Sequence, residues 1–197
     1  MGTNFDELWK STEAKRNDVL KTTFVDGVGA GTLDPVKFGG FVIQDCVYLY
    51  EQYKCIKAAA QRATDKDLKK FLSDVAGKYD GYYRDAFKAW HIEQASGIEL
   101  GTACQAYVKY MQDAQKLDTI YFLVSMTPCL SLWAWLGEQL QKKNKGVYAG
   151  WVKNNFAGGS TLKRLEKEIN EAKLDIGIAK NLFKDGMDHE YKFFSSA

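Results

Sequence analysis

The stretch Tyr121-Phe-Leu-Val-Ser-Met-Thr-Pro-Cys-Leu-Ser-Leu-Trp133 decides the fold class, because it forms the centre of the most apolar part of the chain, residues 120–140. Three residues interrupt this part, namely Pro128, Gly137 and Glu138. A membrane-spanning helix needs about 20 consecutive, predominantly apolar residues. We therefore interpret the stretch as a helix in a protein core and expect no association with a membrane.

The rest of the chain carries helix signals from end to end. It contains only two prolines, and a low proline content favours long helices because proline breaks a helix interior. Capping residues mark three helix starts: Thr3 with Asp6, Asp34 with Pro35, and Thr64 with Asp67. We expect helices over residues 3–21, 35–62, 64–93, 102–115, 118–142, 148–155, 160–173 and 176–194, with a glycine-rich loop at 27–31. Hairpin signals are absent, so the sequence predicts an all-α fold, a single-domain helical bundle over residues 1–197.

Composition and charge exclude several classes of protein. With 197 residues, of which 46% are hydrophobic and 26% charged, the chain has the composition of one globular domain. The net charge is +2 and no long basic stripe is present, so we expect no nucleic acid partner. Residues 1–10 lack the apolar segment of a secretory signal, and the four cysteines show no CxxC spacing. We therefore expect reduced thiols and a cytoplasmic location.

The usual sequence signatures of metal and cofactor sites are also missing. The two histidines, His91 and His189, are too few for a zinc site of the usual kind. The paired Glu-x-x-His motifs of a di-iron bundle are absent, as is a phosphate-binding loop. We expect neither a metal nor another cofactor.

Asp45 breaks the local pattern of the run Phe41-Val-Ile-Gln-Asp-Cys-Val-Tyr-Leu-Tyr50. In a helix, it shares its face with Phe41, Tyr48 and Leu49, which is an apolar stripe. Burying a carboxylate without a partner costs several kcal/mol. Asp45 therefore requires a hydrogen-bond donor, a ligand or a shifted pKa. A structural hydrogen bond and a ligand-binding role both satisfy that requirement.

Pro128-Cys129 is the second irregular place. A proline inside a helix removes a hydrogen bond, here to the carbonyl of Val124, at a cost of roughly 3 kcal/mol. The resulting kink opens the helix where a small nucleophile stands. A thiol with a pKa of about 8.5 is scarcely ionised at neutral pH, so a nucleophilic Cys129 requires an activating neighbour. The alternative is an inert, buried cysteine beside a packing kink. A functional Cys129 is expected to face one buried pocket together with Asp45.

Near the C-terminus, Glu190 and Phe193 share one face of a predicted helix, which places a carboxylate beside an aromatic ring. The alternative is a solvated acid on a terminal helix. The chain is also rich in aromatic residues, with 11 Tyr, 11 Phe and 5 Trp. Five of these could line a slot for a flat ligand or simply fill the core: Tyr48, Tyr107, Trp133, Phe156 and Phe193.

In their order and spacing, these residues resemble the TenA family, the thiaminase II group within the haem-oxygenase-like helical fold. Short motifs distributed over nearly the whole chain carry the resemblance. They are Phe24-Val-Asp-Gly-Val-Gly-Ala-Gly-Thr-Leu33, Gln44-Asp45-x-x-Tyr48-Leu49, Ala106-Tyr107, Thr127-Pro128-Cys129 with Leu136-Gly137, and Glu190-Tyr-x-Phe193. The Gln-Asp-x-x-Tyr-Leu and Pro-Cys motifs are the most specific of them.

The resemblance implies a hydrolase of thiamin salvage or degradation. Such enzymes release ammonia from 4-amino-5-aminomethyl-2-methylpyrimidine, or cleave thiamin into its pyrimidine and thiazole. By position, Cys129 is the implied nucleophile that attacks the pyrimidine ring, and Glu190 is the implied acid/base partner. Asp45 is implied to hold the amidine-like edge of the ring. The resemblance also implies a homotetramer.

The implied substrate wall is aromatic and consists of Tyr48, Tyr107, Trp133, Phe156 and Phe193. Two of its members depart from the family pattern. The family usually has a tyrosine four residues after the cysteine, where this chain has Trp133. Another family tyrosine falls on Phe156 or, with a different gap, on Asn155. These departures affect the hydrogen bonds of the pocket and therefore its substrate.

Two other interpretations stay open at this point. The first is a non-catalytic or divergent pocket that binds another small heteroaromatic ligand. The second is a purely structural helical bundle, in which Asp45 is hydrogen-bonded internally. Placement of Asp45, Cys129 and Glu190 on separate surfaces would favour the structural bundle.

Overall fold

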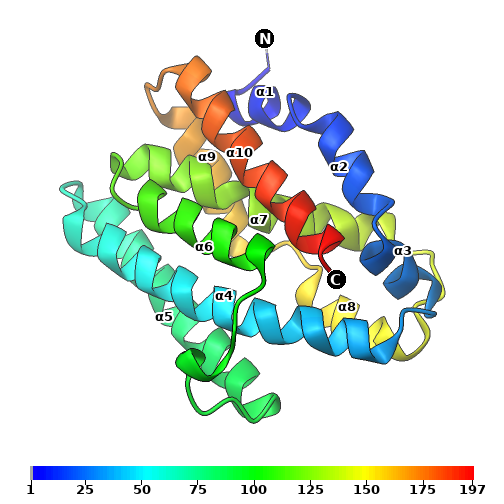
Figure 1. Ribbon diagram of the computed structural model, residues 1–197. Helices are drawn as coiled ribbons and strands as arrows, with labels where there is room; N and C mark the ends of the chain where they lie inside the picture. The colour runs from blue at the N-terminus through cyan, green and yellow to red at the C-terminus, as the bar shows by residue number, and fades with distance from the viewer. Residues whose placement is uncertain (1) are drawn as a thin grey trace.

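The structure, a computed structural model, describes residues 2–197, and all regular structure in this range is helical (Figure 1). Met1, the first residue of the predicted 1–197 domain, lies outside the described residues. The α-helices are α1 (Asn4–Lys10), α2 (Glu13–Leu20), α3 (Thr23–Ala30), α4 (Pro35–Arg62), α5 (Lys66–Ala89), α6 (Thr102–Ala114), α7 (Thr119–Gln139), α8 (Ala149–Asn155), α9 (Ser160–Glu171) and α10 (Ile176–Ser195). Two short 3-10 helices, η1 (Ala95–Gly97) and η2 (Gly146–Tyr148), join them. The prediction of an all-α fold is confirmed.

Side-chain caps explain where several helices begin. Thr3 and Asp6 form the predicted capping box of α1. Asp34 caps α4 as predicted, by accepting a hydrogen bond from a backbone amide of the first turn. At α5 the predicted cap is wrong by one residue, because Asp65 rather than Thr64 accepts the amide hydrogen bond.

The predicted glycine-rich loop at 27–31 is wrong, since these residues belong mostly to helix α3. Thr22 caps α3, and Gly31 ends it in the left-handed conformation, with φ of 73°. Gly27 meets Leu33 so closely that an added Cβ would lie 3.0 Å from the Leu33 Cβ. Glycine at this position therefore allows close packing inside a helix.

The predicted helix over residues 3–21 is interrupted and forms α1 and α2. The hydroxyls of Ser11 and Thr12 donate back to the carbonyls of Leu8 and Trp9. Such bonds compete with the regular backbone ladder of a helix. The chain therefore turns at residues 11–12.

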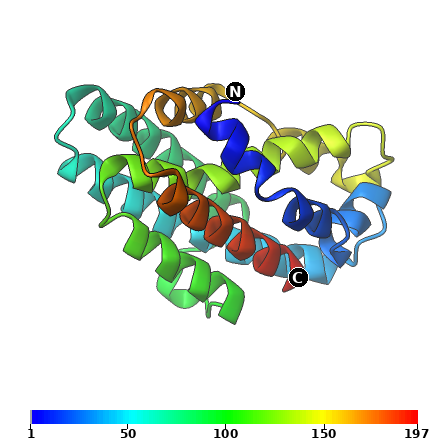
Figure 2. The same cartoon turned by 90° about the horizontal axis from the view of Figure 1, so that it is seen from above.

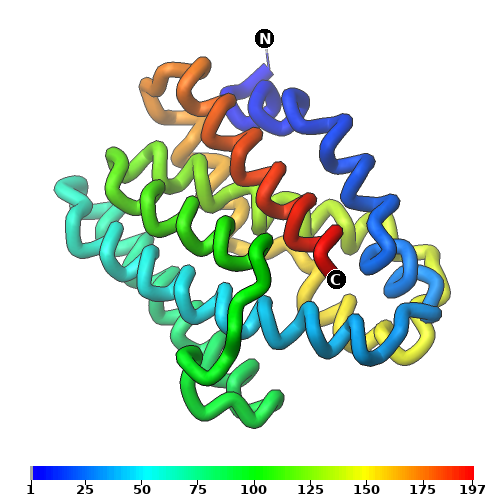
Figure 3. Tube along the Cα trace, viewed as in Figure 1, coloured from blue at the N-terminus to red at the C-terminus, as the bar shows by residue number. Residues whose placement is uncertain are grey.

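The longer helices surround one core. Helices α4 and α5 pack as a pair, α6 and α7 lie beside α4, and α10 packs on α7 and α6 (Figure 1). In the turned view of Figure 2, α10 lies along α6. Helices α1, α2 and α3 also contact α10, as the blue and red parts of the trace in Figure 3 show. Helix α10 thus connects the N-terminal helices with α6 and α7.

Helix α7 contains the apolar stretch 121–133, and most side chains of that stretch are buried. It is the one helix within residues 2–197 that is long and apolar enough to cross a membrane, with a mean hydropathy of 1.4. Of that apolar window, 56% is buried inside the protein. A core helix passes the same test of length and composition, and α7 packs against α4, α6, α8, α9 and α10.

Two glycines allow the backbone to approach α7 closely. An added Cβ at Gly186 of α10 would lie 2.8 Å from Cγ of Pro128, which is too short for a carbon–carbon contact. An added Cβ at Gly137 would lie 2.0 Å from the backbone oxygen of Phe156. These contacts set the spacing of α10 and of the α8–α9 connection relative to α7.

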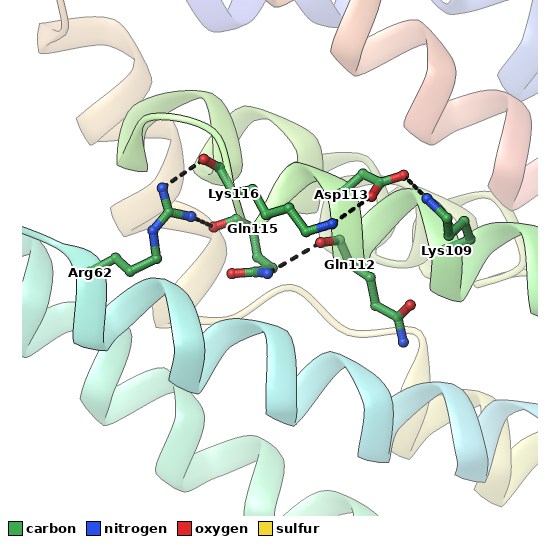
Figure 4. A network of polar contacts seen from close by, with 6 residues as sticks. All are labelled: Arg62, Lys109, Gln112, Asp113, Gln115 and Lys116. Atoms are coloured by element: carbon green, nitrogen blue, oxygen red, sulfur yellow. Dashed lines mark hydrogen bonds and ion pairs between the residues drawn. The ribbon is translucent and has the colours of Figure 1, made fainter.

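Arg62, the last residue of α4, holds the corner between α6 and α7 (Figure 4). Its guanidinium donates hydrogen bonds to the backbone carbonyls of Gln115 and Lys116, which follow α6. Asp113 in turn accepts hydrogen bonds from Lys109 and Lys116. This network fixes how the end of α6 lies against α4.

Candidate functional site

Helices α4, α6, α7 and α10 carry all the predicted site residues except Phe156, and Tyr107 is the one on α6. Asp45 and Tyr48 lie three residues apart on α4, so they share one face. Cys129 lies on α7, and Glu190 lies on α10, where Gly186 brings α10 close to the neighbouring Pro128. The placement on separate surfaces, which would have favoured a purely structural bundle, is not what the structure shows.

Glu190 is the centre of the cluster. Its side chain is 1% exposed, and both carboxylate oxygens accept hydrogen bonds. The hydroxyl of Tyr107 donates to Oε1 at 2.6 Å, and the indole Nε1–H of Trp133 donates to Oε2 at 3.0 Å. Burial raises the pKa of Glu190, while the hydrogen bonds from Tyr107 and Trp133 act in the opposite direction. The carboxylate is therefore held in one orientation by neutral donors.

Asp45 lies close enough to Glu190 for the two carboxylates to affect each other. Burial raises the pKa of Asp45 to about 7, and the charge of Glu190 adds to this effect. Two carboxyl groups in different environments can divide ligand binding from proton transfer. Asp45 therefore titrates near neutral pH, and Glu190 is the group fixed by hydrogen bonds.

The Cys129 thiol lies beside the same carboxylates. Burial raises the pKa of Cys129 well above its ordinary value, and the charges of Glu190 and Asp45 raise it further. The neighbouring phenol of Tyr48 acts in the opposite direction. The resting thiol is therefore protonated, and a reaction at its sulfur requires a base. Glu190 is the neighbouring group with a fixed orientation that can accept the proton.

The aromatic residues form a wall with two parts. Tyr48 packs on Tyr107, with ring centroids 4.5 Å apart, and on Phe193 at 6.1 Å. Trp133 packs edge-on against Phe156 at 5.1 Å. Of the predicted lining residues, Phe156 thus joins the cluster through the ring of Trp133.

Sequence reasoning missed Tyr79 of α5. Burial raises the pKa of its phenol well above the ordinary value, and the charges of Cys129, Asp45 and Glu190 contribute, so Tyr79 lies within electrostatic range of the cluster. A signal was available in the sequence. Tyr79 lies on the single buried stripe of the otherwise charged helix α5, formed by Leu72, Val75, Ala76, Tyr79 and Tyr83.

Helix α4 also carries buried polar atoms that have no partner among residues 2–197. They are the Tyr48 hydroxyl and both polar atoms of the Gln52 amide. Asp45, Tyr48 and Gln52 follow each other at helical spacing along one face. Buried polar groups normally have a protein, water or ligand partner. This face therefore has the capacity to bind polar groups that are not part of the chain.

Two surface hollows lie away from the carboxylates. One, of about 310 Å³, includes Arg62, Asp65 and Asp118 in its lining. The other, of about 470 Å³, includes Gly137 and Phe156. Asp45, Cys129 and Glu190 line neither hollow.

The part of the chain that the structure describes contains no group of three or more His, Cys, Asp or Glu side chains that could hold a metal ion. Its four cysteines are free thiols. The groups available for chemistry at the cluster are therefore two carboxyls, one thiol, three phenols and one indole.

The fold and the cluster define a class of all-α protein with a thiol and two buried carboxyl groups gathered between its helices. The model of the TENA/THI-4/PQQC family matches residues 9–197 of the chain. The chain belongs to this family.

Solved and curated relatives agree with this assignment. The chain is similar to the TenA homologue protein from P. horikoshii OT3, with a TM-score of 0.88 and 22% identity, covering 98% of this chain and 97% of that one. It is 21% identical over 216 residues to the Aminopyrimidine aminohydrolase of Helicobacter pylori, covering 96% of each. It is 32% identical over 135 residues to the Hydroxymethylpyrimidine/phosphomethylpyrimidine kinase THI20 of Saccharomyces cerevisiae, which covers 64% of this chain. The match spans only 24% of that yeast protein.

Proposed function

We propose that the protein is a hydrolase of thiamin salvage that acts on an aminopyrimidine through a cysteine nucleophile. Its substrate is an aminomethyl-aminopyrimidine, from which it releases ammonia, or thiamin itself. The membership of the TENA/THI-4/PQQC family and the Helicobacter pylori relative support this proposal. The observation that carries it is that the Cys129 thiol lies near enough to Asp45 and Glu190 for their charges to raise its pKa, and that Tyr107 and Trp133 hold the Glu190 carboxylate in place.

The residues divide the chemistry between binding and proton transfer. Asp45 binds the amidine-like edge of the pyrimidine, where the ring nitrogen and the amino group lie side by side. The Tyr48 hydroxyl, which has no hydrogen-bond partner among residues 2–197, is proposed to bond the substrate. Phe193 packs beside Tyr48 and offers a flat surface to the ring.

Glu190 carries the proton in the reaction. The sulfur of Cys129 bonds to a ring carbon, and its proton passes to Glu190. The bond between the methylene carbon and the amine then breaks, and the amine leaves as ammonia with that proton. The oxygen of a water molecule then bonds to the methylene carbon, and one proton of that water passes to Glu190. The sulfur–carbon bond breaks, and Glu190 gives this second proton to the departing sulfur, which re-forms the thiol. The balance is one amine and one water converted into one alcohol and one ammonia.

No step of this sequence requires a metal or another cofactor. A homotetramer and a cytoplasmic location belong to the same proposal, because the family resemblance implies the first and the four free cysteines are compatible with the second. Sedimentation analysis of the purified protein tests the assembly, with a mass of about four chains of 22.3 kDa expected.

The decisive experiment measures ammonia release from 4-amino-5-aminomethyl-2-methylpyrimidine beside thiamin cleavage. The wild-type protein is expected to turn over one of the two substrates. Cys129→Ser is expected to lose turnover by a factor of about 100 or more while it still binds the pyrimidine. Wild-type protein that binds the pyrimidine without turnover would contradict the enzyme and favour a non-catalytic pocket.

A further inference from the structure

His189 directly precedes Glu190 on α10 and has no role in the proposed reaction. Its ring stacks on the ring of Tyr107, with centroids 5.3 Å apart and an angle of 9° between the planes. It also contacts Tyr110, one turn further along α6, at 4.9 Å. The imidazole therefore packs against two tyrosines of the neighbouring helix.

Tyr107 is the residue whose orientation matters for Glu190. Its side chain is 1% exposed, and its hydroxyl donates to the Glu190 carboxylate at 2.6 Å. Tyr48 packs on the Tyr107 ring as well, at 4.5 Å. His189 and Tyr48 together restrict how the Tyr107 ring can turn.

An imidazole is chemically unexpected at this position. Its Nδ1 is buried and has no partner in the described part of the chain. A phenyl ring would fill similar space without burying an unpaired polar atom. Residues that break a local rule of this kind concentrate at functional sites.

Burial of His189 favours a neutral ring. Burial lowers the pKa of His189, and Lys192 lowers it further, while Asp185 and Asp188 raise it. The side chains that face it from α6 are the uncharged phenols of Tyr107 and Tyr110. At neutral pH the ring therefore acts as a flat, uncharged packing surface.

We propose that His189 is a positioning residue that holds the Tyr107 ring so that its hydroxyl donates to Glu190. The packing argument stands on the geometry alone, whereas the catalytic consequence rests on the proposed function. Because the Tyr107 hydrogen bond lowers the pKa of Glu190, loss of this orientation is expected to raise that pKa.

The test compares His189→Leu with His189→Phe. Leucine fills the position with an apolar side chain but removes the flat ring, whereas phenylalanine fills it with an apolar side chain that is also a flat ring. The titration of Glu190 is followed by NMR of protein labelled with 13C at the glutamate carboxyls, and Glu190→Gln assigns the signal. His189→Leu is expected to move the midpoint of this titration to higher pH, and His189→Phe is expected to restore it toward the wild-type value.

A double-mutant cycle with Tyr107→Phe separates positioning from general loosening of the fold. In the Tyr107→Phe background the hydroxyl is already absent, so His189→Leu is expected to add little further shift. The matched control is His91→Asn, at the exposed second histidine, where the backbone φ of 53° suits asparagine. An equal shift with and without the Tyr107 hydroxyl, or no shift at all, would overturn the inference.

Activity provides an independent measurement. His189→Leu is expected to lower kcat by about tenfold with little change in KM, because proton transfer is affected and Asp45 is not. If the wild type shows no turnover but the titration shifts as expected, the proposed function fails and the positioning role stands. If the wild type is active and the titration does not move, the positioning role fails.

Discussion

At the scale of single residues, Trp133 replaces a tyrosine that the family resemblance expects, yet it keeps a hydrogen bond to Glu190. Trp133→Phe removes the indole N–H and leaves a buried carboxylate oxygen without that donor. We expect a loss of about 1–3 kcal/mol in the free energy of unfolding, together with a lower kcat. Thermal unfolding and steady-state kinetics measure the two effects.

Trp133→Tyr is the matched comparison, because it supplies a hydroxyl donor on a smaller ring. It is expected to retain more of the kcat of the wild type than Trp133→Phe does. Equal kcat values for the two variants would show that the hydrogen bond to Glu190 has no part in turnover.

Asp45 links stability to pH. Its pKa of about 7 in the folded chain lies above the ordinary value of 3.8, so the folded state binds the proton more tightly than the unfolded state. Stability from this group is fully present below about pH 4 and is lost as the pH rises to about 7, by at most about 4 kcal/mol. Asp45→Asn is expected to remove that loss, as urea unfolding measured across this pH range would show.

The control is Asp85→Asn, at an exposed position in α5, which should leave the pH dependence unchanged. The same Asp45→Asn protein is expected to bind the aminopyrimidine much more weakly while its helical circular dichroism stays intact. Collapse of the helical signal would instead identify Asp45 as a structural carboxylate.

Sequence reasoning selected Asp45 for its place on an apolar stripe, Cys129 for the proline before it, and Glu190 for the face it shares with Phe193. The family resemblance gave the three residues their roles, and the structure brings them together. It missed Tyr79, since a tyrosine on a buried helical stripe looks like an ordinary core residue. It also had no means of finding that Trp133 donates to Glu190, because that contact joins residues 57 positions apart. Contacts of this kind depend on how α7 and α10 pack.

At the scale of elements, Gly186 decides how closely α10 approaches α7. Gly186→Ala would place a Cβ 2.8 Å from Cγ of Pro128 and 3.3 Å from the backbone oxygen of Ser125. We expect the two helices to separate, with a loss of about 1–3 kcal/mol in the free energy of unfolding. Chemical denaturation measures this loss, and the displacement of Glu190 is expected to lower kcat as well.

Gly77→Ala is the matched control, because an added Cβ in the middle of α5 meets nothing within 4 Å. It is expected to stabilise the protein by about 0.5–1 kcal/mol through helix propensity alone. A stabilising Gly186→Ala would contradict the role of close packing between α7 and α10.

The helices themselves were predictable to different degrees. Helix α4 has the predicted bounds, because a strong cap and a proline at its first position define its start. Helix α3 was not predicted, since its glycines signal a loop unless the close contact of Gly27 with Leu33 is known. Sequence signals thus predict a helix such as α4, whose capping residues are adjacent in the chain. They fail for a helix such as α3, which depends on tertiary packing.

At the scale of the whole molecule, the end of α10 joins elements from distant parts of the chain. The Phe194 ring is fully buried and packs on Phe24 of α3, Phe41 of α4, Trp133 of α7 and Phe156. Phe194→Ala is expected to lower the free energy of unfolding by about 3–5 kcal/mol.

Because the Phe194 ring touches so many helices, Phe194→Ala should destabilise the whole protein as one unit. Far-UV and near-UV circular dichroism are expected to show a single, coincident transition at lower denaturant. Ser195→Ala, at the exposed neighbouring position, is the control and should change little. Two separate transitions would show that α10 does not couple the N-terminal helices to α7.

The indole of Trp133 has a further consequence for the movement of protons. A phenol can donate one hydrogen bond and accept another, so it can pass a proton onward, whereas an indole N–H can only donate. The Oε2 atom of Glu190 is therefore hydrogen-bonded to a group that cannot pass a proton onward. A proton taken up by Glu190 cannot exchange through Trp133. It can move only between Glu190 and the thiol, the substrate or Tyr107.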